Sequence, residues 1–219
     1  MSRYEVAHLE EIEELTDGRE PYRAVRHHLG ISAFGVTAWT GHAEGDRILN
    51  EHDEKDGDDE DIGAEELYVV LAGRARFELD DERVDAPTGT FVFVPPGTKR
   101  TAFAEEPETT IVAVGATPGK PYEARGWELW APLFPVYQRG EHAEVVTRLR
   151  PLVEAHPRYP LLFFNLACCE SMTGEKEQAL EHLRRALELS DEFRAYARED
   201  SDLDPIRDEP AFKEIVGPE

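Results

Sequence analysis

The segment from Glu51 to Asp61 carries the densest set of side chains that could do chemistry, namely His52 and eight carboxylates. Carboxylates at this density could hold calcium, which prefers oxygen ligands. However, the run that begins at Asp56 lacks the alternating ligands and the glutamate at the twelfth position of a hand-type calcium loop. Because so many acids are costly to bury, we predict that most of this segment is a solvated surface loop.

Other residues with chemical potential give weaker signals. The sequence has no glycine loop that would cradle a phosphate and no serine nucleophile elbow. We expect His42 to lie in a connection between strands, and Cys168 and Cys169 to be buried thiols on a helix. Five other histidines are expected in solvated or structural positions: His27, His28, His142, His156 and His182.

Residues from about 29 to 115 have the pattern of β-strands. β-branched and aromatic residues gather in short runs, and residues 74–79 alternate charged and apolar side chains. Turn residues such as Gly73 and Pro95-Pro96-Gly97 separate these runs. Many short strands at this spacing predict an all-β sandwich or barrel.

After about residue 125 the period becomes helical. A 34-residue self-similarity appears when Gly140 is laid over Gly174, which also aligns Leu149 with Leu183. This is the period of the tetratricopeptide (TPR) helix–turn–helix repeat. We therefore predict a TPR-like helical domain over residues 126–219, with repeats at about 126–159 and 160–193 and a capping helix at about 202–216.

Two glycine-bounded segments of the strand region resemble the two cupin motifs. In the first, six residues separate Glu66 from Gly73; in the second, Gly89 precedes the spaced set Pro95, Gly97 and Arg100. The resemblance implies a cupin (RmlC-like) β-barrel, the double-stranded β-helix or jelly roll, over residues 1–125, with an N-terminal extension and an acidic loop at 51–64. With its helical tail, the chain is similar to uncharacterised bacterial cupin–TPR proteins.

In cupins the two motifs supply three histidines and a glutamate, which usually hold a divalent transition metal. The resemblance places Glu66 at the glutamate position and Arg100 at the histidine position of the second motif. If residues 55–64 are an insertion, His52 and Glu54 take the other two positions. A guanidinium is always protonated and cannot bind a cation. We therefore expect a degenerate site without a metal; any metal would bind to His52, Glu54 and Glu66.

The position of Glu66 also predicts which neighbouring side chains face the interior. If Glu66 points inward, so does Tyr68, and Phe77 with either Phe91 or Phe93 would line an apolar cavity. Aromatic walls with a few charged groups are typical of small-molecule sites. The expected ligand-binding set is His52, Glu54, Glu66, Tyr68, Phe77, Phe93 and Arg100.

The charge balance narrows the possible partners. The chain has 24 basic and 47 acidic residues, for a formal charge of −23, which disfavours nucleic acids and anionic membrane surfaces. No run approaches the ~20 apolar residues needed to span a bilayer, and the first residues do not resemble a secretory leader. These features favour a cytoplasmic protein. The acidic, lysine-poor composition fits a salt-adapted proteome or a GC-rich genome.

Three functions remain open. We prefer a non-catalytic protein whose barrel binds a small molecule, such as a carboxylate at Arg100, while its helices contact a protein partner. The second is a metal-dependent enzyme of the dioxygenase or isomerase type that uses His52, Glu54 and Glu66. The third is a metal-free acid–base enzyme with Glu66 as the base and Arg100 binding an anionic substrate. The structural alternative is a salt-bridged pocket that only rigidifies the barrel. We expect a homodimer, because cupins commonly pair through barrel faces.

Overall fold

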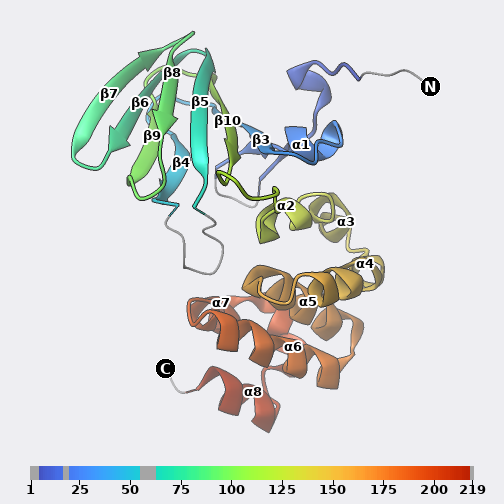
Figure 1. Cartoon of the computed structure of the whole chain (residues 1–219). Coiled ribbons are helices and arrows are strands. Elements are labelled where there is room, and N and C mark those ends of the chain that lie inside the picture. The colour runs from blue at the N-terminus through green and yellow to red at the C-terminus, as the bar shows by residue number, and fades with distance from the viewer. Residues whose placement is uncertain (1–4, 17–19, 55–62, 218–219) are drawn as a thin grey trace. The chain divides into compact units, whose positions relative to one another are not determined.

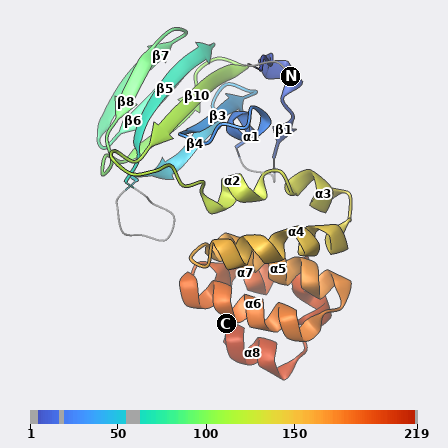
Figure 2. The ribbon, with the colours of Figure 1, turned by 45° about the vertical axis from the view of Figure 1, so that its right-hand side comes forward.

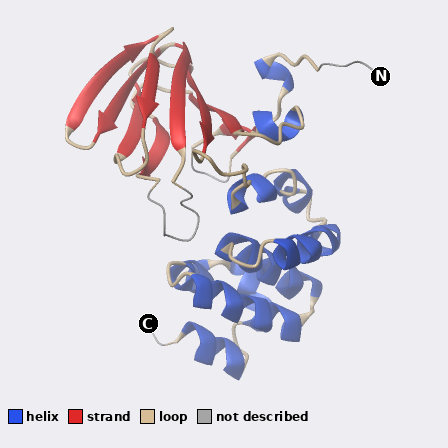
Figure 3. Ribbon diagram, viewed as in Figure 1, coloured by secondary structure: helices blue, strands red, loops and turns tan. Residues whose placement is uncertain are grey.

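The computed structural model describes residues 5–16, 20–54 and 63–217 (Figure 1). It divides into two compact units, Met1–Ala124 and Arg125–Glu219. Strands dominate the first unit and helices make up the second (Figure 3). The predicted jelly-roll fold of the N-terminal half and the helical C-terminal region are both confirmed. Among the described residues, no helix is long and apolar enough to cross a membrane.

The strands of the first unit form two antiparallel sheets. In the described residues, one sheet has six strands in the order β1-β2-β3-β10-β5-β8, and the other has four in the order β4-β9-β6-β7. The strands are β1 (Glu14–Leu15), β2 (Tyr22–Arg23), β3 (Gly35–Gly41), β4 (Arg47–His52), β5 (Glu65–Ala72), β6 (Arg74–Leu79), β7 (Glu82–Pro87), β8 (Phe91–Val94), β9 (Arg100–Ala104) and β10 (Thr109–Ala116). The 3-10 helix η1 (Leu9–Glu11) and the helix α1 (Val25–His28) precede β3.

The core of this unit lies between the two sheets. Val70 and Ile111 from the six-stranded sheet pack with Ile48 and Phe77 from the four-stranded sheet, and each is at most 1% exposed. The turn between β5 and β6 needs a glycine, because Gly73 has a φ of 69° and a Cβ there would lie 2.8 Å from the Cα of Thr109. The motif glycine that the sequence singled out therefore shapes the turn that joins the two sheets.

The second unit is a stack of helices around its own core. Its longest elements, α4, α5 and α6, lie side by side (Figure 2). The core is built on residues such as Leu149, Leu162 and Leu183, each fully buried. The helices are α2 (Gly126–Trp130), α3 (Phe134–Gln138), α4 (His142–Ala155), α5 (Pro160–Thr173), α6 (Lys176–Leu189), α7 (Phe193–Glu199) and α8 (Pro210–Val216), with the 3-10 helix η2 (Ser201–Ile206) before α8.

The helical unit differs from the predicted repeats in two places. The first helix expected within residues 126–159 is divided into α2 and α3, because Pro132 lacks the N–H that a continuing helix would use, whereas Pro135 is tolerated in the first turn of α3. The capping helix expected at 202–216 is also divided, into η2 and α8. By contrast, α5 and α6 are joined through Gly174, which has a φ of 84° and caps α5.

Candidate functional site

Four of the residues expected in the site come together between the two sheets. His52 ends β4 and pairs across the ladder with Arg100, the first residue of β9. Glu66 lies on β5 of the other sheet, and Glu54 follows β4 by two residues. Their side chains are buried, with relative exposures of 0% for Glu54 and Arg100, 11% for Glu66 and 21% for His52. The site is therefore enclosed and most open beside His52.

The imidazole of His52 faces both carboxylates through one nitrogen. Its Nε2 lies 3.4 Å from an oxygen of Glu66 and 3.7 Å from an oxygen of Glu54. Its Nδ1 lies 2.8 Å from the backbone carbonyl of Asn50, to which it donates a hydrogen bond. This bond fixes the ring orientation, so that Nε2 is the nitrogen available to a ligand.

Glu66 is the centre of the charge network. Its Oε2 accepts a hydrogen bond from the hydroxyl of Tyr68 and lies 3.5 Å from Nε of Arg100. The guanidinium also donates from Nη2 to the carbonyl of Pro95 over 3.3 Å. Its Nη1 is buried and makes no hydrogen bond within the described part of the chain. Arg100 therefore has an N–H donor beside the carboxylates that makes no hydrogen bond to the described residues.

The backbone after β4 turns sharply to bring Glu54 into the site. Glu54 adopts a left-handed conformation with a φ of 55°, which costs a residue with a Cβ about 1–2 kcal/mol. The adjacent carbonyl of Asp53 accepts a hydrogen bond of 2.6 Å from the amide of Gly97, which follows β8. This contact ties the end of β4 to the loop before Arg100. The strained backbone conformation of Glu54 thus occurs where it places the carboxylate of this residue inside the barrel.

Gly115 is a functional position that the sequence analysis missed. It lies opposite Glu66 in the pairing of β10 with β5, and a Cβ on it would come within 3.1 Å of the Cγ of Glu66. The absence of a side chain therefore leaves room for the Glu66 carboxylate. The signal in the sequence is a glycine inside a strand rich in β-branched residues, which often marks a close approach.

The carboxylates shift the protonation of their neighbours. Burial disfavours the charged form of His52, but the hydrogen bond and charge of Glu66, the carbonyl of Asn50 and the charge of Glu54 outweigh it and raise the pKa of His52 above 6.5. Burial, followed by the charge and hydrogen bond of Glu66, raises the pKa of the Tyr68 hydroxyl well above 10. Tyr68 is therefore a hydrogen-bond donor at neutral pH.

Two of the three expected aromatic residues face the interior. Tyr68 and Phe77 are 1% and 0% exposed, and their rings lie 5.6 Å apart between centroids. Phe93 does not join them, because it is 59% exposed and pairs with the outward-facing Leu67. Strand alternation explains the correction: β8 buries Val92 and Val94, so both phenylalanines of this strand point outward.

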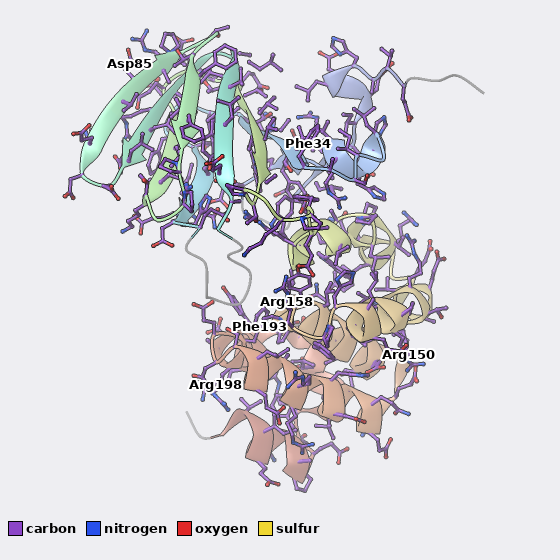
Figure 4. The ribbon with its side chains drawn as sticks, viewed as in Figure 1. Phe34, Asp85, Arg150, Arg158, Phe193 and Arg198 are labelled. Carbon is purple, nitrogen blue, oxygen red and sulfur yellow. The ribbon has the colours of Figure 1, made fainter. Side chains whose placement is uncertain are left out.

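The other candidate residues lie apart from this site. His27 and His28 are exposed at the end of α1, and Cys168 and Cys169 are buried as expected. In the helical unit, Glu170 accepts from Arg150 on α4 (Figure 4) over 2.9 Å and contacts His182 over 2.6 Å, which is a structural network. Residues 55–62 of the predicted acidic loop lie outside the described residues.

Comparison with known proteins gives one family match, which lies within the first unit. Residues 53–114 match the model of the cupin domain family. No curated protein matches the chain.

The chain is similar to the solved structure of a cupin protein from Bacteroides fragilis, with 16% identity over 57% of this chain and 92% of that one and a TM-score of 0.42. An RmlC-like cupin from Desulfovibrio desulfuricans has 23% identity over 52% and 97%, with a TM-score of 0.41. A predicted oxalate decarboxylase from Thermotoga maritima has 16% identity over 51% and 97%, with a TM-score of 0.41. The family match and the two-sheet fold identify residues 53–114 as a cupin domain.

Proposed function

We propose that the cupin domain binds a divalent transition metal through His52, Glu54 and Glu66 and holds a small carboxylate beside it. The observation that carries this proposal is the convergence of one ligand atom from each residue, all within 4.8 Å of one another. Metal–ligand bonds of about 2.0–2.2 Å separate neighbouring ligand atoms by about 3.0–3.5 Å. The 3.4 and 3.7 Å separations from the His52 nitrogen are close to this range.

The residues fit a metal chemically as well as sterically. The hydrogen bond from Nδ1 of His52 to the Asn50 carbonyl is the kind of support that orients metal-binding histidines. One imidazole and two carboxylates suit iron, manganese or zinc. A bound metal supplies a Lewis acid that polarises the oxygen of a ligand. The sequence favoured a metal-free pocket because of Arg100, whereas the geometry favours a metal beside it.

Charge balance supports a carboxylate as the second ligand. A divalent cation neutralises Glu54 and Glu66, so the permanent charge of Arg100 leaves the site with one positive charge in excess. An anion restores neutrality, which matters in an enclosed site of low effective dielectric. The buried Nη1 of Arg100 has no hydrogen-bond partner among the described residues and can donate to that anion.

A metal-free pocket is the second candidate, and the raised pKa of His52 favours it. When His52 is protonated, it and Arg100 together balance the two carboxylates without a metal. The pocket then rigidifies the barrel through ion pairs, and an added anion is not needed for neutrality. The two candidates therefore differ in the protonation of His52. With neutral His52 the empty site has a net negative charge and attracts a cation, whereas with protonated His52 the empty site is already neutral.

Titration calorimetry of chelator-treated protein with Mn²⁺ or Zn²⁺ separates the candidates. We expect one site per chain in the wild type, and affinity at least about 100-fold lower in His52→Ala and Glu54→Gln. His42→Ala is the matched control, because His42 also contacts two glutamates, Glu14 and Glu108, and should leave the affinity unchanged. Wild-type protein that binds neither ion would support the metal-free pocket instead.

The carboxylate ligand is tested on the Mn²⁺-loaded protein. A panel of small mono- and dicarboxylates should include compounds that raise the melting temperature, and Arg100→Gln should abolish that shift while still binding the metal. Arg100→Lys, which keeps the charge but loses the planar donor pair, should retain part of it. If the same compounds stabilise wild type and Arg100→Gln equally, Arg100 does not bind the ligand.

We also propose that α5 and α6 form one TPR-type unit. Their equal lengths, the left-handed Gly174 between them and the fully buried Ala167 and Ala179 support close packing of two antiparallel helices. TPR packing requires small residues where the helices cross. Ala179→Leu should therefore lower the free energy of unfolding by about 1–3 kcal/mol, as measured by urea denaturation. A neutral effect would exclude this mode of packing.

A further inference from the structure

Arg100 lies where the strand that carries it begins. It is the first residue of β9, which lies between β4 and β6 (Figure 1). In the ladder with β6 it forms the last pair, opposite Leu79. In the ladder with β4 it pairs with His52, after a shift of register. Among the described residues neither ladder continues past Arg100, so other contacts must hold the loop that precedes it.

Asp80 holds the residue just before Arg100 through two hydrogen bonds. The amide of Asp80 donates to the carbonyl of Lys99 over 2.8 Å, and Oδ1 of its carboxylate accepts from the amide of Lys99 over 2.9 Å. The carbonyl of Lys99 and the amide of Arg100 belong to one planar peptide group. The first of these bonds therefore fixes the plane from which Arg100 extends, and the second fixes the peptide group before it.

The turn that contains Asp80 does not by itself require a carboxylate. β6 and β7 are joined by the two residues 80 and 81, because Leu79 pairs with Glu82. Asp80 adopts a left-handed conformation with a φ of 50°. Glycine takes up this conformation at no steric cost, and asparagine tolerates it as aspartate does. What glycine lacks is the side-chain acceptor that receives the amide of Lys99, so this acceptor is the part of Asp80 that acts on the loop.

The loop between Pro95 and Arg100 is tied at its other end as well. The amide of Gly97 donates to the carbonyl of Asp53 over 2.6 Å, and Nη2 of Arg100 donates back to the carbonyl of Pro95 over 3.3 Å. Because the guanidinium binds its own loop, a shift of the loop also moves Nη1. This buried nitrogen is the donor that has no hydrogen-bond partner among the described residues.

We propose that Asp80 is a positioning residue for the guanidinium of Arg100. This role rests on the proposed carboxylate site, in which Nη1 of Arg100 donates to the ligand. Asp80 is exposed and acts through the backbone of Lys99. A binding group is effective when supporting hydrogen bonds hold it within about 0.5 Å of the productive position. Loss of the Asp80 side chain should therefore weaken carboxylate binding more than metal binding, because the metal ligands lie at the end of β4 and on β5.

Two substitutions separate the side-chain bond of Asp80 from the turn. Asp80→Gly keeps the left-handed backbone and removes the acceptor, whereas Asp80→Asn keeps both. The NMR signal of the Arg100 Nε–H group reports the position of the guanidinium in chelator-treated protein, since this group is fully buried beside Glu66. In Asp80→Gly the signal should move toward that of an exposed arginine, and its proton should exchange faster with water. The signal should stay unchanged in Asp80→Asn and in Asp81→Gly, the control in the same turn.

The second readout is calorimetry of Mn²⁺-loaded protein with acetate, oxalate and malonate as probes. The affinity for the probes that bind wild type should fall at least about tenfold in Asp80→Gly and be restored in Asp80→Asn, while the affinity for Mn²⁺ falls less. An unchanged Arg100 signal in folded Asp80→Gly, or equal losses of affinity for Mn²⁺ and carboxylate, would overturn the positioning role. If no probe binds the wild type, the carboxylate function fails, and the NMR signal still decides whether Asp80 positions Arg100.

Discussion

His42 and His52 both lie in the first unit and each contacts two glutamates, but they use their ring nitrogens differently. His42 directs Nε2 to Glu14 over 2.9 Å and Nδ1 to Glu108 over 3.1 Å, and its side chain is 43% exposed. His52 directs Nε2 toward both of its carboxylates and commits Nδ1 to a backbone carbonyl. Within the described residues, the His52 group is the one whose ligand atoms converge.

This difference shows that residue types alone do not make a metal site. A ring that shares its two nitrogens between two carboxylates links two segments of chain, here the start of the unit and the turn before β10. A ring with one nitrogen fixed by the backbone presents the other to a common point. The predictions below test whether the buried cluster around His52 behaves as a charged site and the exposed cluster around His42 as a surface link.

The largest effect is expected from Arg100→Ala in metal-free protein. The change leaves Glu54 and Glu66 buried without their permanent cation and should lower the free energy of unfolding by about 3–5 kcal/mol. Urea denaturation in the presence of a chelator measures this loss. Excess Mn²⁺ should restore part of it, because a bound cation replaces the lost charge. A loss below about 1 kcal/mol would show that the buried carboxylates do not need Arg100.

Gly115→Ala should have the next largest effect. The new Cβ would lie 3.1 Å from the Cγ of Glu66, so the carboxylate must move. We expect a loss of about 1–3 kcal/mol in stability from overpacking, together with Mn²⁺ affinity reduced about tenfold. Thermal denaturation and calorimetry measure the two quantities. If alanine instead stabilises the protein by restricting the unfolded chain, Gly115 does not make room for Glu66.

Tyr68→Phe should have a smaller effect, because it removes one hydrogen bond to Glu66 and leaves the ring in place. We expect a loss of about 1 kcal/mol in urea denaturation. Tyr196→Phe, at an exposed position, is the control and should have no measurable effect. An alkaline absorbance titration adds a second readout, since the Tyr68 hydroxyl should resist ionisation until the protein unfolds. Equal stability of the two variants would contradict the buried hydrogen bond.

The smallest effect concerns the pH dependence of His42. Hydrogen bonds to Glu14 and Glu108 raise the pKa of His42 above 6.5, despite opposing desolvation, and Arg23 lies 2.7 Å from Glu14 on the other side. The stabilisation is therefore fully present below pH 6.5 and is lost as the pH rises through the pKa of the folded protein. An NMR titration should give a midpoint above 6.5 that falls in Glu108→Gln. A midpoint at or below 6.5 would exclude the link.

The scaffold could be predicted from the sequence because its signals are local. The spacing of Glu66, Gly73 and Pro95 reflects strand and turn lengths, and the inward direction of Tyr68 follows from strand alternation. The direction of Phe93 could not be predicted, because β8 is apolar on both faces and its pattern does not show which face is buried. The division of the first helix of the first predicted repeat into α2 and α3 is caused by Pro132, with Pro135 in the first turn of α3. Aligning the chain at a 34-residue period does not show the effect of these two prolines.

The geometry of the site could not be predicted from the sequence, for a different reason. It depends on one local contact, from His52 to the carbonyl of Asn50, and on two contacts between distant segments: the amide of Gly97 on Asp53, and the space left by Gly115 opposite Glu66. None of these contacts leaves a periodic pattern.

The most direct test of the account is the metal content of wild-type protein purified without chelator and without metal-affinity chromatography. Elemental analysis should find about one equivalent of iron, manganese or zinc per chain, with the same amount in His42→Ala and less than about a tenth of it in His52→Ala. A wild type that contains no stoichiometric metal, or a His52→Ala variant that keeps it, would contradict the proposed site.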